Sequence, residues 1–383
     1  MKRVAVLGST GSVGKNALEV IKRLPNKLSV SGLAADKNIE LLAKQAAEFN
    51  CDKISCNIEY SQRLSLITPG ETKICPGING MIEIATDKNT DIVLCAVVGT
   101  AALMPVLEAI RAGKDIAIAS KEILVMAGEL VMAEARKHNV KILPVDSEHC
   151  AIFQCVENKK HSDISKIILT ASGGALKNWT TEQIAKATCK DALAHPTWSM
   201  GPKITIDSAS LMNKALEIIE AKWLFGLNPN QIDVVIHPQS IIHSMVEFID
   251  GSILAQMSVT DMKFPIQYSL TYPEKIDGLK HLNLIKLKFL TFEEPDRTRF
   301  PSLDYAFHAM NVGGTMPAVM NAANELAVDI FLKNKIRFPD IWKIIEKTMS
   351  AHKVIHSPTI EQIIEADKWA KQAAINIAYG SPF

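Results

Sequence analysis

The sequence feature that most constrains the fold is a glycine-rich turn close to the amino terminus. The apolar run of residues 4–7 leads into Gly8, Gly11 and Gly14, and apolar side chains then recur at helical spacing over residues 17–21. A strand, a glycine turn and a helix N-terminus in this order let backbone N–H groups and the helix dipole hold a pyrophosphate. The GxxGxxG spacing also fits a tight strand-to-helix turn in another kind of α/β domain. We favour a dinucleotide site because further strand–helix units follow.

The pattern continues in four more short apolar runs, over residues 28–33, 91–97, 115–119 and 141–145. Runs of this length and composition are typical of strands that are buried on both faces of a sheet. Helical periodicity lies between them, for example over residues 103–111. This alternation predicts an α/β fold with a doubly wound, Rossmann-like parallel sheet over residues 1–149. Ligands of such sheets lie beyond the carboxyl ends of the strands.

Charged residues follow two of these carboxyl ends. Asp36, Lys37 and Asn38 come after the second strand, where NAD enzymes place an acid for the ribose and NADP enzymes a cation for the 2′-phosphate. Because both kinds of residue are present, they do not settle the choice of cofactor. Lys121 and Glu122 follow the strand that ends at residue 119. Their position fits a functional role, and it also fits a solvated start of a helix.

Two carboxylates, Asp146 and Glu148, stand one residue apart after the strand predicted over residues 141–145. Side chains at this spacing share a face in extended chain, so their oxygens could bind one hard cation such as Mg²⁺ or Mn²⁺. The alternative is that Asp146 or Ser147 caps the following helix, with Glu148 in its acidic first turn. Local chemistry alone favours the capping interpretation.

Two glycine- and proline-containing segments follow in the middle of the chain. A strand predicted over residues 164–170 ends in the turn Ser172-Gly173-Gly174, which either cradles a phosphate or reverses the chain. Residues 194–202 then contain two prolines, a glycine and Trp198. This composition predicts a lid loop over about residues 185–202 with an apolar plug. A loop tryptophan can equally be pinned to the protein surface.

The next segment gathers groups that suit a phosphate. Asp207 or Ser208 is predicted to cap a helix that continues past residue 220. Ser208, Asn213 and Lys214 would then place a hydroxyl, an amide and an ammonium near a helix N-terminus, which fits a phosphate monoester. Glu217 lies three residues beyond Lys214, and it is a candidate third carboxylate for the metal. Mid-helix glutamates are usually solvated, so spacing alone does not establish this role.

The last third changes from strand patterns to helix patterns. Strands are predicted over residues 232–236, 245–249, 253–257 and 287–292, the second and third of them forming a hairpin around Asp250-Gly251. Helices are predicted over residues 303–310, 317–332, 338–349 and 359–378. The domain organisation that we predict is a cofactor domain (1–149), a central α/β catalytic domain (150–270), a connector (271–299) and a C-terminal helical domain (300–383).

Composition excludes several classes of protein. A net charge of +1 and the lack of long like-charge blocks argue against nucleic-acid binding. No apolar run approaches the length of a membrane span, and the early first strand leaves no room for a signal or transit peptide. The seven cysteines form no CxxC pair, which indicates buried thiols in a reducing compartment. We therefore expect a cytoplasmic protein without nucleic-acid or membrane partners.

Seven motifs in order resemble one enzyme family, 1-deoxy-D-xylulose 5-phosphate reductoisomerase. They are found at residues 8–14, 144–149, 170–174, 195–201, 207–214, 236–247 and 321–325. The resemblance implies a homodimeric enzyme of the non-mevalonate route to isoprenoids that acts on a phosphorylated sugar. It would rearrange 1-deoxy-D-xylulose 5-phosphate by a metal-dependent retro-aldol/aldol sequence and reduce the product with NADPH to 2-C-methyl-D-erythritol 4-phosphate.

The resemblance also implies roles for individual residues. The ligands of a divalent metal (Mg²⁺, Mn²⁺ or Co²⁺) would be Asp146, Glu148 and Glu217, and the catalytic residues would be Lys121, Glu148, His195 and Glu217. Substrate would bind Lys121, Ser147, Glu148, Ser172, His195, Trp198, Ser208, Asn213, Lys214 and Glu217. NADPH would contact Thr10, Gly11, Ser12, Val13, Asp36, Lys37, Asn38, Ser120, Glu122 and Gly201. Family members commonly carry Gly in place of Asp36 and Asn in place of Ser120, and an acid near a 2′-phosphate repels it unless turned away.

Two other readings of the sequence remain. An NAD(P)-dependent semialdehyde or homoserine-type dehydrogenase can share the glycine turn, but a semialdehyde enzyme needs a catalytic cysteine. Cys150, beside His149, is the only candidate, and its expected place inside a helix argues against an exposed thiolate. A nucleotide-sensing or scaffold protein without chemistry is the non-enzyme alternative. The presence of all three carboxylates argues against it.

Overall fold

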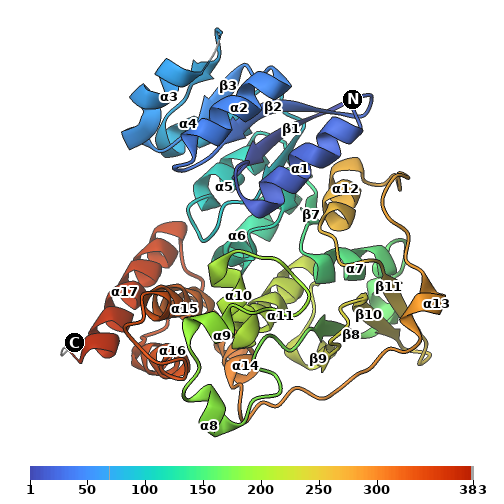
Figure 1. Ribbon diagram of the computed structural model, residues 1–383, viewed down its shortest axis with the longest axis vertical. Helices are drawn as coiled ribbons and strands as arrows, with labels where there is room; N and C mark the ends of the chain where they lie inside the picture. The colour runs from blue at the N-terminus through green and yellow to red at the C-terminus, as the bar shows by residue number, and fades with distance from the viewer. Residues whose placement is uncertain (69, 381–383) are drawn as a thin grey trace. The chain divides into compact units, whose positions relative to one another are not determined.

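The computed structural model describes residues 1–68 and 70–380, and the chain forms two compact units. The first unit contains Met1–Ile123, Glu129–Cys150 and Asp261–Lys280. The second contains Leu124–Gly128, Ala151–Thr260 and the chain from His281 onward. The domain boundaries predicted after residues 149, 270 and 299 stay predictions. Figure 1 shows that the chain returns to the first unit through helix α12 (Lys263–Thr271) after building much of the second.

The first unit is built on a sheet of seven parallel strands in the order β4-β3-β2-β1-β5-β6-β7. The central strand β1 (Lys2–Leu7) forms because the run of residues 4–7 is fully buried there. It pairs with β2 (Leu28–Ala34) and β5 (Ile92–Cys95). The other strands are β3 (Lys53–Ser55), β4 (Lys73–Ile74), β6 (Asp115–Ile118) and β7 (Ile142–Pro144). The predicted Rossmann-like sheet is therefore confirmed, with two short strands at one side, β3 and β4, that the sequence pattern did not predict.

Helices cover both faces of this sheet (Figure 1). They are α1 (Ser12–Arg23), α2 (Ile39–Phe49), α3 (Ser61–Ile67), α4 (Gly77–Ala85), α5 (Leu103–Arg111) and α6 (Lys121–Lys137). Right-handed crossovers place α1 and α2 on one face and α4 and α5 on the other, because the strand order reverses direction at β1. Helix α12 packs against α1, β6 and β7. Its Ser269 hydroxyl donates to the Pro144 carbonyl at 2.6 Å.

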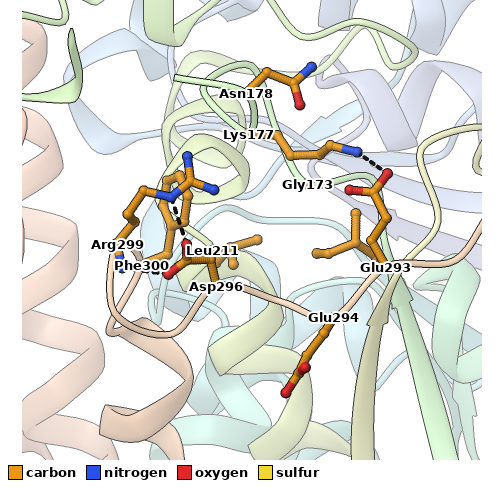
Figure 2. Close-up of a pocket in the computed structure, with 10 residues that line it drawn as sticks. Gly173, Lys177, Asn178, Leu211, Glu293, Glu294, Asp296, Arg299 and Phe300 are labelled. Carbon is orange, nitrogen blue, oxygen red and sulfur yellow. Dashed lines mark hydrogen bonds and ion pairs between the residues drawn. The ribbon is translucent and has the colours of Figure 1, made fainter. Parts of the chain in front are cut away.

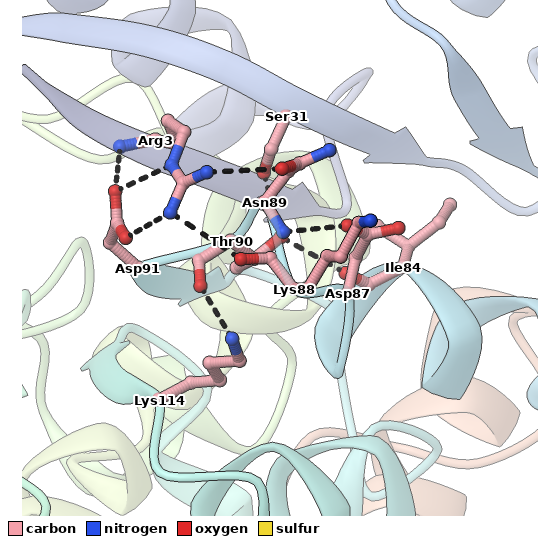
Figure 3. Close-up of polar contacts among 9 residues, drawn as sticks. All are labelled: Arg3, Ser31, Ile84, Asp87, Lys88, Asn89, Thr90, Asp91 and Lys114. Carbon is pink, nitrogen blue, oxygen red and sulfur yellow. Dashed lines mark hydrogen bonds and ion pairs between the residues drawn. The ribbon is translucent and has the colours of Figure 1, made fainter.

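Polar contacts tie the amino ends of three strands together (Figure 3). The Arg3 guanidinium forms an ion pair with Asp91 at 2.7 Å and a hydrogen bond with the Asn89 side chain at 3.1 Å. The Lys114 ammonium donates to the Thr90 carbonyl at 2.7 Å. These contacts join the starts of β1, β5 and β6. They lie at the end of the sheet opposite to the one where ligands bind in this fold.

The second unit contains a four-stranded sheet in the order β11-β10-β8-β9. Strand β8 (Ile164–Ala171) pairs in parallel with β9 (Ile232–Ile236) and antiparallel with β10 (Ile242–Phe248). Strand β11 (Ile253–Met257) completes an antiparallel hairpin with β10, as the sequence predicts. Among the described residues β11 pairs with β10 alone, so its other edge presents backbone groups that the sheet does not use.

The helices of the second unit share one large hydrophobic core with this sheet. They are α8 (Thr181–Ile184), α9 (Cys189–Ala192), α10 (Pro202–Ala209), α11 (Met212–Phe225), α14 (Ser302–Val312), α15 (Met316–Leu332), α16 (Asp340–Ala351) and α17 (Ile360–Tyr379). The four C-terminal helices confirm the predicted helical region. Helix α7 (Ser147–Val156) crosses the boundary between the two units. None of the described helices combines the length and the apolar character needed to cross a bilayer.

Two local predictions are wrong. The strand expected over residues 287–292 is absent, and the chain instead forms the short helix α13 (Leu284–Leu287), followed by a single bridge from Glu293 to Ile236. Lys288 breaks the extended run because its φ of +65° turns the backbone out of the β region. Neither Asp207 nor Ser208 caps a helix: α10 begins at Pro202 and contains both, and a separate helix, α11, begins at Met212. The proline at the first helical position marks the start of α10, because its fixed φ suits a helix and its missing N–H needs no partner there.

Candidate functional site

The glycine turn joins β1 to α1 by backbone contacts that exclude side chains. Gly8 has φ +91°, and a Cβ on it would lie 2.4 Å from the Ala96 carbonyl oxygen. A Cβ on Gly14 would lie 2.2 Å from the Gly8 carbonyl oxygen. Only glycine therefore fits at both positions. Helix α1 follows with Gly11 at its N-cap and no side-chain cap, which leaves N–H groups of its first turn without a side-chain acceptor. The predicted contacts Thr10, Gly11, Ser12 and Val13 all lie in this turn.

The end of β2 places the other predicted cofactor residues at the surface. Asp36, Lys37 and Asn38 are exposed. The Asp36 carboxylate accepts a hydrogen bond from the Asn57 side chain at 3.0 Å, so one of its oxygens is already bound within the fold. Asn38 caps α2 by accepting from the Leu41 N–H at 3.3 Å. Lys37 therefore supplies an exposed positive charge after β2. It lies next in the chain to Asp36, whose carboxylate is bound by Asn57.

Ser120 differs from the cofactor residues at the surface because it is buried. Its hydroxyl donates to the Val97 carbonyl at 2.5 Å, which ties the start of α6 to the segment after β5. Lys121 and Glu122 follow it in the first turn of α6, and both are buried. The alternative interpretation of these two residues as a solvated helix start is therefore wrong.

The carboxylates Asp146 and Glu148 stand where β7 gives way to α7. Asp146 occupies the position before the first helical residue, and its carboxylate accepts from the Ser147 N–H at 3.2 Å. The same carboxylate forms an ion pair with the Lys121 ammonium. The Ser147 hydroxyl donates to Glu148 at 2.6 Å. Capping and ligand roles are thus compatible, because an ion-paired carboxylate at a helix start keeps oxygens that a cation can share.

His149 and Cys150 follow these carboxylates in the first turn of α7. The His149 imidazole is fully buried, with Nδ1 3.9 Å from Asp146 Oδ2. Cys150 is buried inside α7 at 2% exposure. A thiol in this position cannot reach a substrate as a nucleophile, which argues against the semialdehyde dehydrogenase alternative.

The second unit carries the residues that suit a phosphate. Asn213 and Lys214 lie in the first turn of α11, one and two residues after the helix begins at Met212. Glu217 follows one turn later and is fully buried, unlike an ordinary mid-helix glutamate. Its two oxygens accept hydrogen bonds from Asn213, at 2.5 Å, and from Lys214. The helix therefore aligns an amide, an ammonium and a carboxylate along one face.

The turn after β8 meets α10 backbone to backbone. Gly174 has φ +71°, and a Cβ on it would lie 2.4 Å from the Ser208 carbonyl oxygen. The Gly174 N–H donates to the Ser172 hydroxyl at 3.2 Å. Ser172 and Ser208, both predicted to hold phosphate, are thus carried by segments in direct contact. Gly201, the predicted cofactor residue before α10, is exposed, and a Cβ there would meet no other atom.

His195 links the predicted lid to the turn after β8. Its Nε2 lies 2.9 Å from the Ser172 hydroxyl, and its Nδ1 accepts from the N–H groups of Thr197 and Trp198. Because Nδ1 accepts, Nε2 carries the proton and donates to Ser172. Burial lowers the pKa of the His195 imidazole below its ordinary value, which favours this neutral form. The Trp198 ring lies against His243, with ring centroids 6.3 Å apart.

A polar pocket of about 310 Å³ lies on another side of the same turn (Figure 2). Lys177 and Glu293 form an ion pair across it at 2.5 Å, and Arg299 and Asp296 form a second at 2.8 Å. Gly173 belongs to its wall. The pocket contains none of the predicted site residues. The Lys177–Glu293 pair fastens the segment around residues 293–299 to the chain just after the turn that carries Ser172, whereas the Arg299–Asp296 pair lies within that segment.

Comparisons with known proteins cover nearly all of the chain. A family model described as 1-deoxy-D-xylulose 5-phosphate reductoisomerase matches residues 4–128, and the model of its C-terminal domain matches residues 142–225. A third model, the DXP reductoisomerase C-terminal domain, matches residues 257–373. The 1-deoxy-D-xylulose 5-phosphate reductoisomerase of Pelotomaculum thermopropionicum is 50% identical over 383 residues, which cover 98% of each chain. That of Chlorobaculum tepidum is 50% identical over 377 residues, covering 98% of this chain and 99% of the relative.

Solved structures give the same result. The reductoisomerase of Zymomonas mobilis in complex with NADPH is 39% identical, with a TM-score of 0.92 over 98% of this chain and 99% of that one. A DOX-P reductoisomerase in complex with NADPH, fosmidomycin and magnesium is 40% identical, with a TM-score of 0.93 over 99% of this chain and 98% of that one. Matches that cover 98% or more of the chain span the region that holds the seven motifs. The chain therefore belongs to the 1-deoxy-D-xylulose 5-phosphate reductoisomerase family.

Proposed function

We propose that this chain converts 1-deoxy-D-xylulose 5-phosphate to 2-C-methyl-D-erythritol 4-phosphate, with NADPH as reductant and a divalent metal as cofactor. The observation that carries the proposal is family membership over nearly the whole chain, with relatives of this activity 50% identical to it. The reaction belongs to the non-mevalonate route to isoprenoids.

We assign the metal to Asp146, Glu148 and Glu217. These three make up one of the groups of side chains, among residues 1–68 and 70–380, with donor atoms suited to an ion. Three carboxylates offer oxygen donors and three negative charges, which fits hard divalent cations. Mg²⁺ is the ion present in the solved relative described above, and Mn²⁺ and Co²⁺ accept the same donors.

The substrate phosphate would be held by Ser172, Ser208, Asn213 and Lys214. Two hydroxyls, an amide and an ammonium can each donate hydrogen bonds to phosphate oxygens, and the first turn of α11 adds the positive end of a helix dipole. The Lys214 ammonium forms an ion pair with Glu217 on the same helix. Binding energy from this end of the substrate would help order the lid that carries His195 and Trp198.

At the reacting end, the bound metal would act as a Lewis acid on the ketone and the neighbouring hydroxyl of the substrate. Lys121 would sit beside that end because its ammonium is fixed by Asp146. Ser147 would reach the substrate from the same helix start, with its hydroxyl oriented by Glu148. The rearrangement is a retro-aldol/aldol sequence, and hydride transfer from NADPH then reduces the aldehyde that it forms.

NADPH would bind with its pyrophosphate at the Gly8–Gly14 turn and its 2′-phosphate near Lys37 and Asn38. The hydrogen bond from Asn57 to Asp36 supports this assignment, because it orients the exposed carboxylate and partly offsets its repulsion of a phosphate. Ser120 would act through the backbone of residues 95–97, which its hydroxyl holds. Glu122 and Gly201 complete the proposed contacts.

We also propose that the chain forms a homodimer through the free edge of β11. Ile253 and Leu254 on this strand are exposed, and so are Ile285 and Phe289 on the segment after residue 283. An exposed edge strand with apolar side chains is the kind of surface that a second copy covers by continuing the sheet. We expect the enzyme in the cytoplasm, because all seven cysteines are free.

The decisive experiment is oxidation of NADPH by purified protein in the presence of 1-deoxy-D-xylulose 5-phosphate, with and without Mg²⁺. We expect oxidation that stops when a chelator removes the metal and returns when Mg²⁺ is restored. Oxidation that survives chelation would instead point to a dehydrogenase that needs no metal, and a lack of oxidation under all conditions would overturn the proposal.

A further inference from the structure

The residues proposed to hold the phosphate lie on both sides of a strained junction. Ser208 is near the end of α10, and Asn213 and Lys214 open α11, with residues 209–211 between them. Leu211 has φ +60°, a left-handed conformation that a bulky side chain rarely adopts. Such a conformation persists only where surrounding contacts fix it. The contacts that fix this junction come from the C-terminal helices.

Helices α14 and α16 hold the end of α10. The Ser302 hydroxyl donates to the Ser210 carbonyl at 2.7 Å and accepts from the Trp342 indole N–H at 2.9 Å. The Ser302 side chain is fully buried. The carbonyls of a last helical turn have no partner within the helix, so this hydroxyl satisfies one that would otherwise be buried without a donor.

Helix α15 holds α10 at a second point. The Asn324 amide donates to the buried Asp207 carboxylate at 2.9 Å, and the Lys203 ammonium lies 2.8 Å from the other oxygen of that carboxylate. Asp207 is 1% exposed and Asn324 is fully buried. Removing one partner of a buried carboxylate is costly, because the remaining negative charge is then not compensated. The contacts of Asp207 therefore hold α10 firmly in place. The residue next to Asp207 in the chain is Ser208.

We propose that Ser302 and Asn324 are positioning residues for the substrate phosphate. They act through Ser210 and Asp207, and they set the spacing between Ser208 on α10 and the two donors on α11. The close approach of Gly174 to the Ser208 carbonyl also fixes the position of α10 relative to the turn that contains Ser172. This inference rests on the proposed function of the site, and it assigns to the C-terminal helices the preorganisation of the phosphate end.

The test compares Ser302→Ala and Asn324→Ala with the matched control Thr348→Val. Thr348 is also a fully buried residue of the C-terminal helices, but its hydroxyl donates to the Ile344 carbonyl within α16. We expect KM for 1-deoxy-D-xylulose 5-phosphate to rise about fivefold in each test variant, the effect of one hydrogen bond. We expect kcat and the Kd for NADPH to change by less than about twofold, because the lost interaction binds ground and transition states alike.

Calorimetric titration with inorganic phosphate gives a second readout that needs no turnover. The test variants should bind phosphate about fivefold more weakly than wild type and Thr348→Val should bind it equally well. If wild-type protein binds phosphate but does not turn over the sugar phosphate, the proposed function fails while this titration still decides the inference. Equal phosphate binding in wild type and both test variants, or equal weakening in the control, would overturn it.

A less disruptive variant tests the role of Ser302 if Ser302→Ala does not fold. Trp342→Phe keeps an aromatic ring beside Phe338 and removes the N–H that orients the Ser302 hydroxyl, together with part of the indole. We expect a smaller rise in KM, about twofold, with cooperative urea unfolding preserved. An unchanged KM and unchanged phosphate affinity in this folded variant would count against the role of Ser302.

Discussion

His195 and Ser172 are joined by a hydrogen bond of 2.9 Å between the imidazole Nε2 and the hydroxyl, although 23 residues separate them. The bond ties the predicted lid to the turn proposed to hold the substrate phosphate. The same imidazole fixes the lid backbone through its other nitrogen, which accepts from Thr197 and Trp198. One side chain thus connects the fold of the lid to the phosphate end of the site.

The first prediction concerns the coupling between these two residues. Ser172→Ala and His195→Gln should each raise KM for the sugar phosphate, and the double variant should raise it by less than the product of the two. The shortfall measures the shared hydrogen bond, about 1 kcal/mol. Steady-state kinetics on the four proteins gives this double-mutant cycle. Strictly multiplicative effects would mean that the two side chains act independently.

The second prediction concerns pH. Burial places the pKa of His195 in the folded protein below its ordinary value of 6.5, so the unfolded chain binds more protons in the interval between the two pKa values. Stability is therefore lost as the pH falls through 6.5 toward the folded pKa. Protonation also puts a hydrogen on Nδ1, which can then no longer accept from the lid backbone.

Urea unfolding and KM, both measured from pH 7.5 to 5.5, check this prediction. We expect the free energy of unfolding to fall and KM to rise toward the acid end. His195→Gln should flatten the pH dependence of KM. His352, whose pKa burial also lowers, serves as a comparison because it binds Thr315 far along the chain from the lid. His352→Gln should change the stability curve and leave the KM profile as in wild type.

The third prediction concerns the metal ligands. Glu217→Gln keeps the size of the side chain and one acceptor oxygen but removes the charge that a divalent cation needs. We expect kcat to fall by about 10²-fold or more and Mg²⁺ to bind weakly, with NADPH affinity nearly unchanged. Turnover assays at increasing Mg²⁺ and fluorescence titration with NADPH provide the measurements. Full activity in this variant would rule out its role as a ligand.

The fourth prediction concerns the glycine turn. Gly8→Ala introduces a Cβ 2.4 Å from the Ala96 carbonyl oxygen at a residue with φ +91°, so it combines a collision with backbone strain. We expect a loss of more than about 1 kcal/mol in unfolding free energy and a weaker NADPH complex. Gly113→Ala is the matched control: its φ is +73°, but no atom lies within 4 Å of the added Cβ. The control should show the strain alone and bind NADPH normally.

The fifth prediction concerns the proposed homodimer. Leu254→Lys places a charge on the exposed edge strand β11, where a second copy would have to bury it. We expect a shift from dimer to monomer in light scattering coupled to size-exclusion chromatography. Leu66→Lys changes an exposed leucine of α3 and should leave the mass unchanged. A dimeric Leu254→Lys protein would place the interface elsewhere.

Local patterns in the sequence predicted most of the regular structure. Strands such as β1 are short apolar runs between turn residues, and helices such as α5 have an apolar period near 3.6, so both signals lie within one segment. The short strands β3 and β4 were not predicted, because two or three residues are too few to show a periodic pattern. The strand expected over residues 287–292 does not form because Lys288 has a positive φ, which a lysine in the sequence does not predict.

The candidate site could be predicted only in part for a similar reason. The aligned groups on α11 follow from helical spacing, since Asn213 and Lys214 stand four and three residues before Glu217. The burial of Glu217 does not follow from spacing, because it depends on what packs around the helix. The bond between Ser172 and His195 and the support from Asn324 join distant segments. Only the tertiary structure brings such pairs together.

The position of α12 has a consequence for how the protein is made. The ribosome completes β7 at residue 144, yet the helix that packs on β6 and β7 spans Lys263–Thr271 and emerges more than a hundred residues later. During that interval the parts of α1, β6 and β7 that α12 covers have no cover from their own unit. A fragment that stops at residue 149 would keep this surface exposed permanently, and we expect it to aggregate. The cofactor unit is therefore finished late in synthesis, although its first strand is among the earliest residues made.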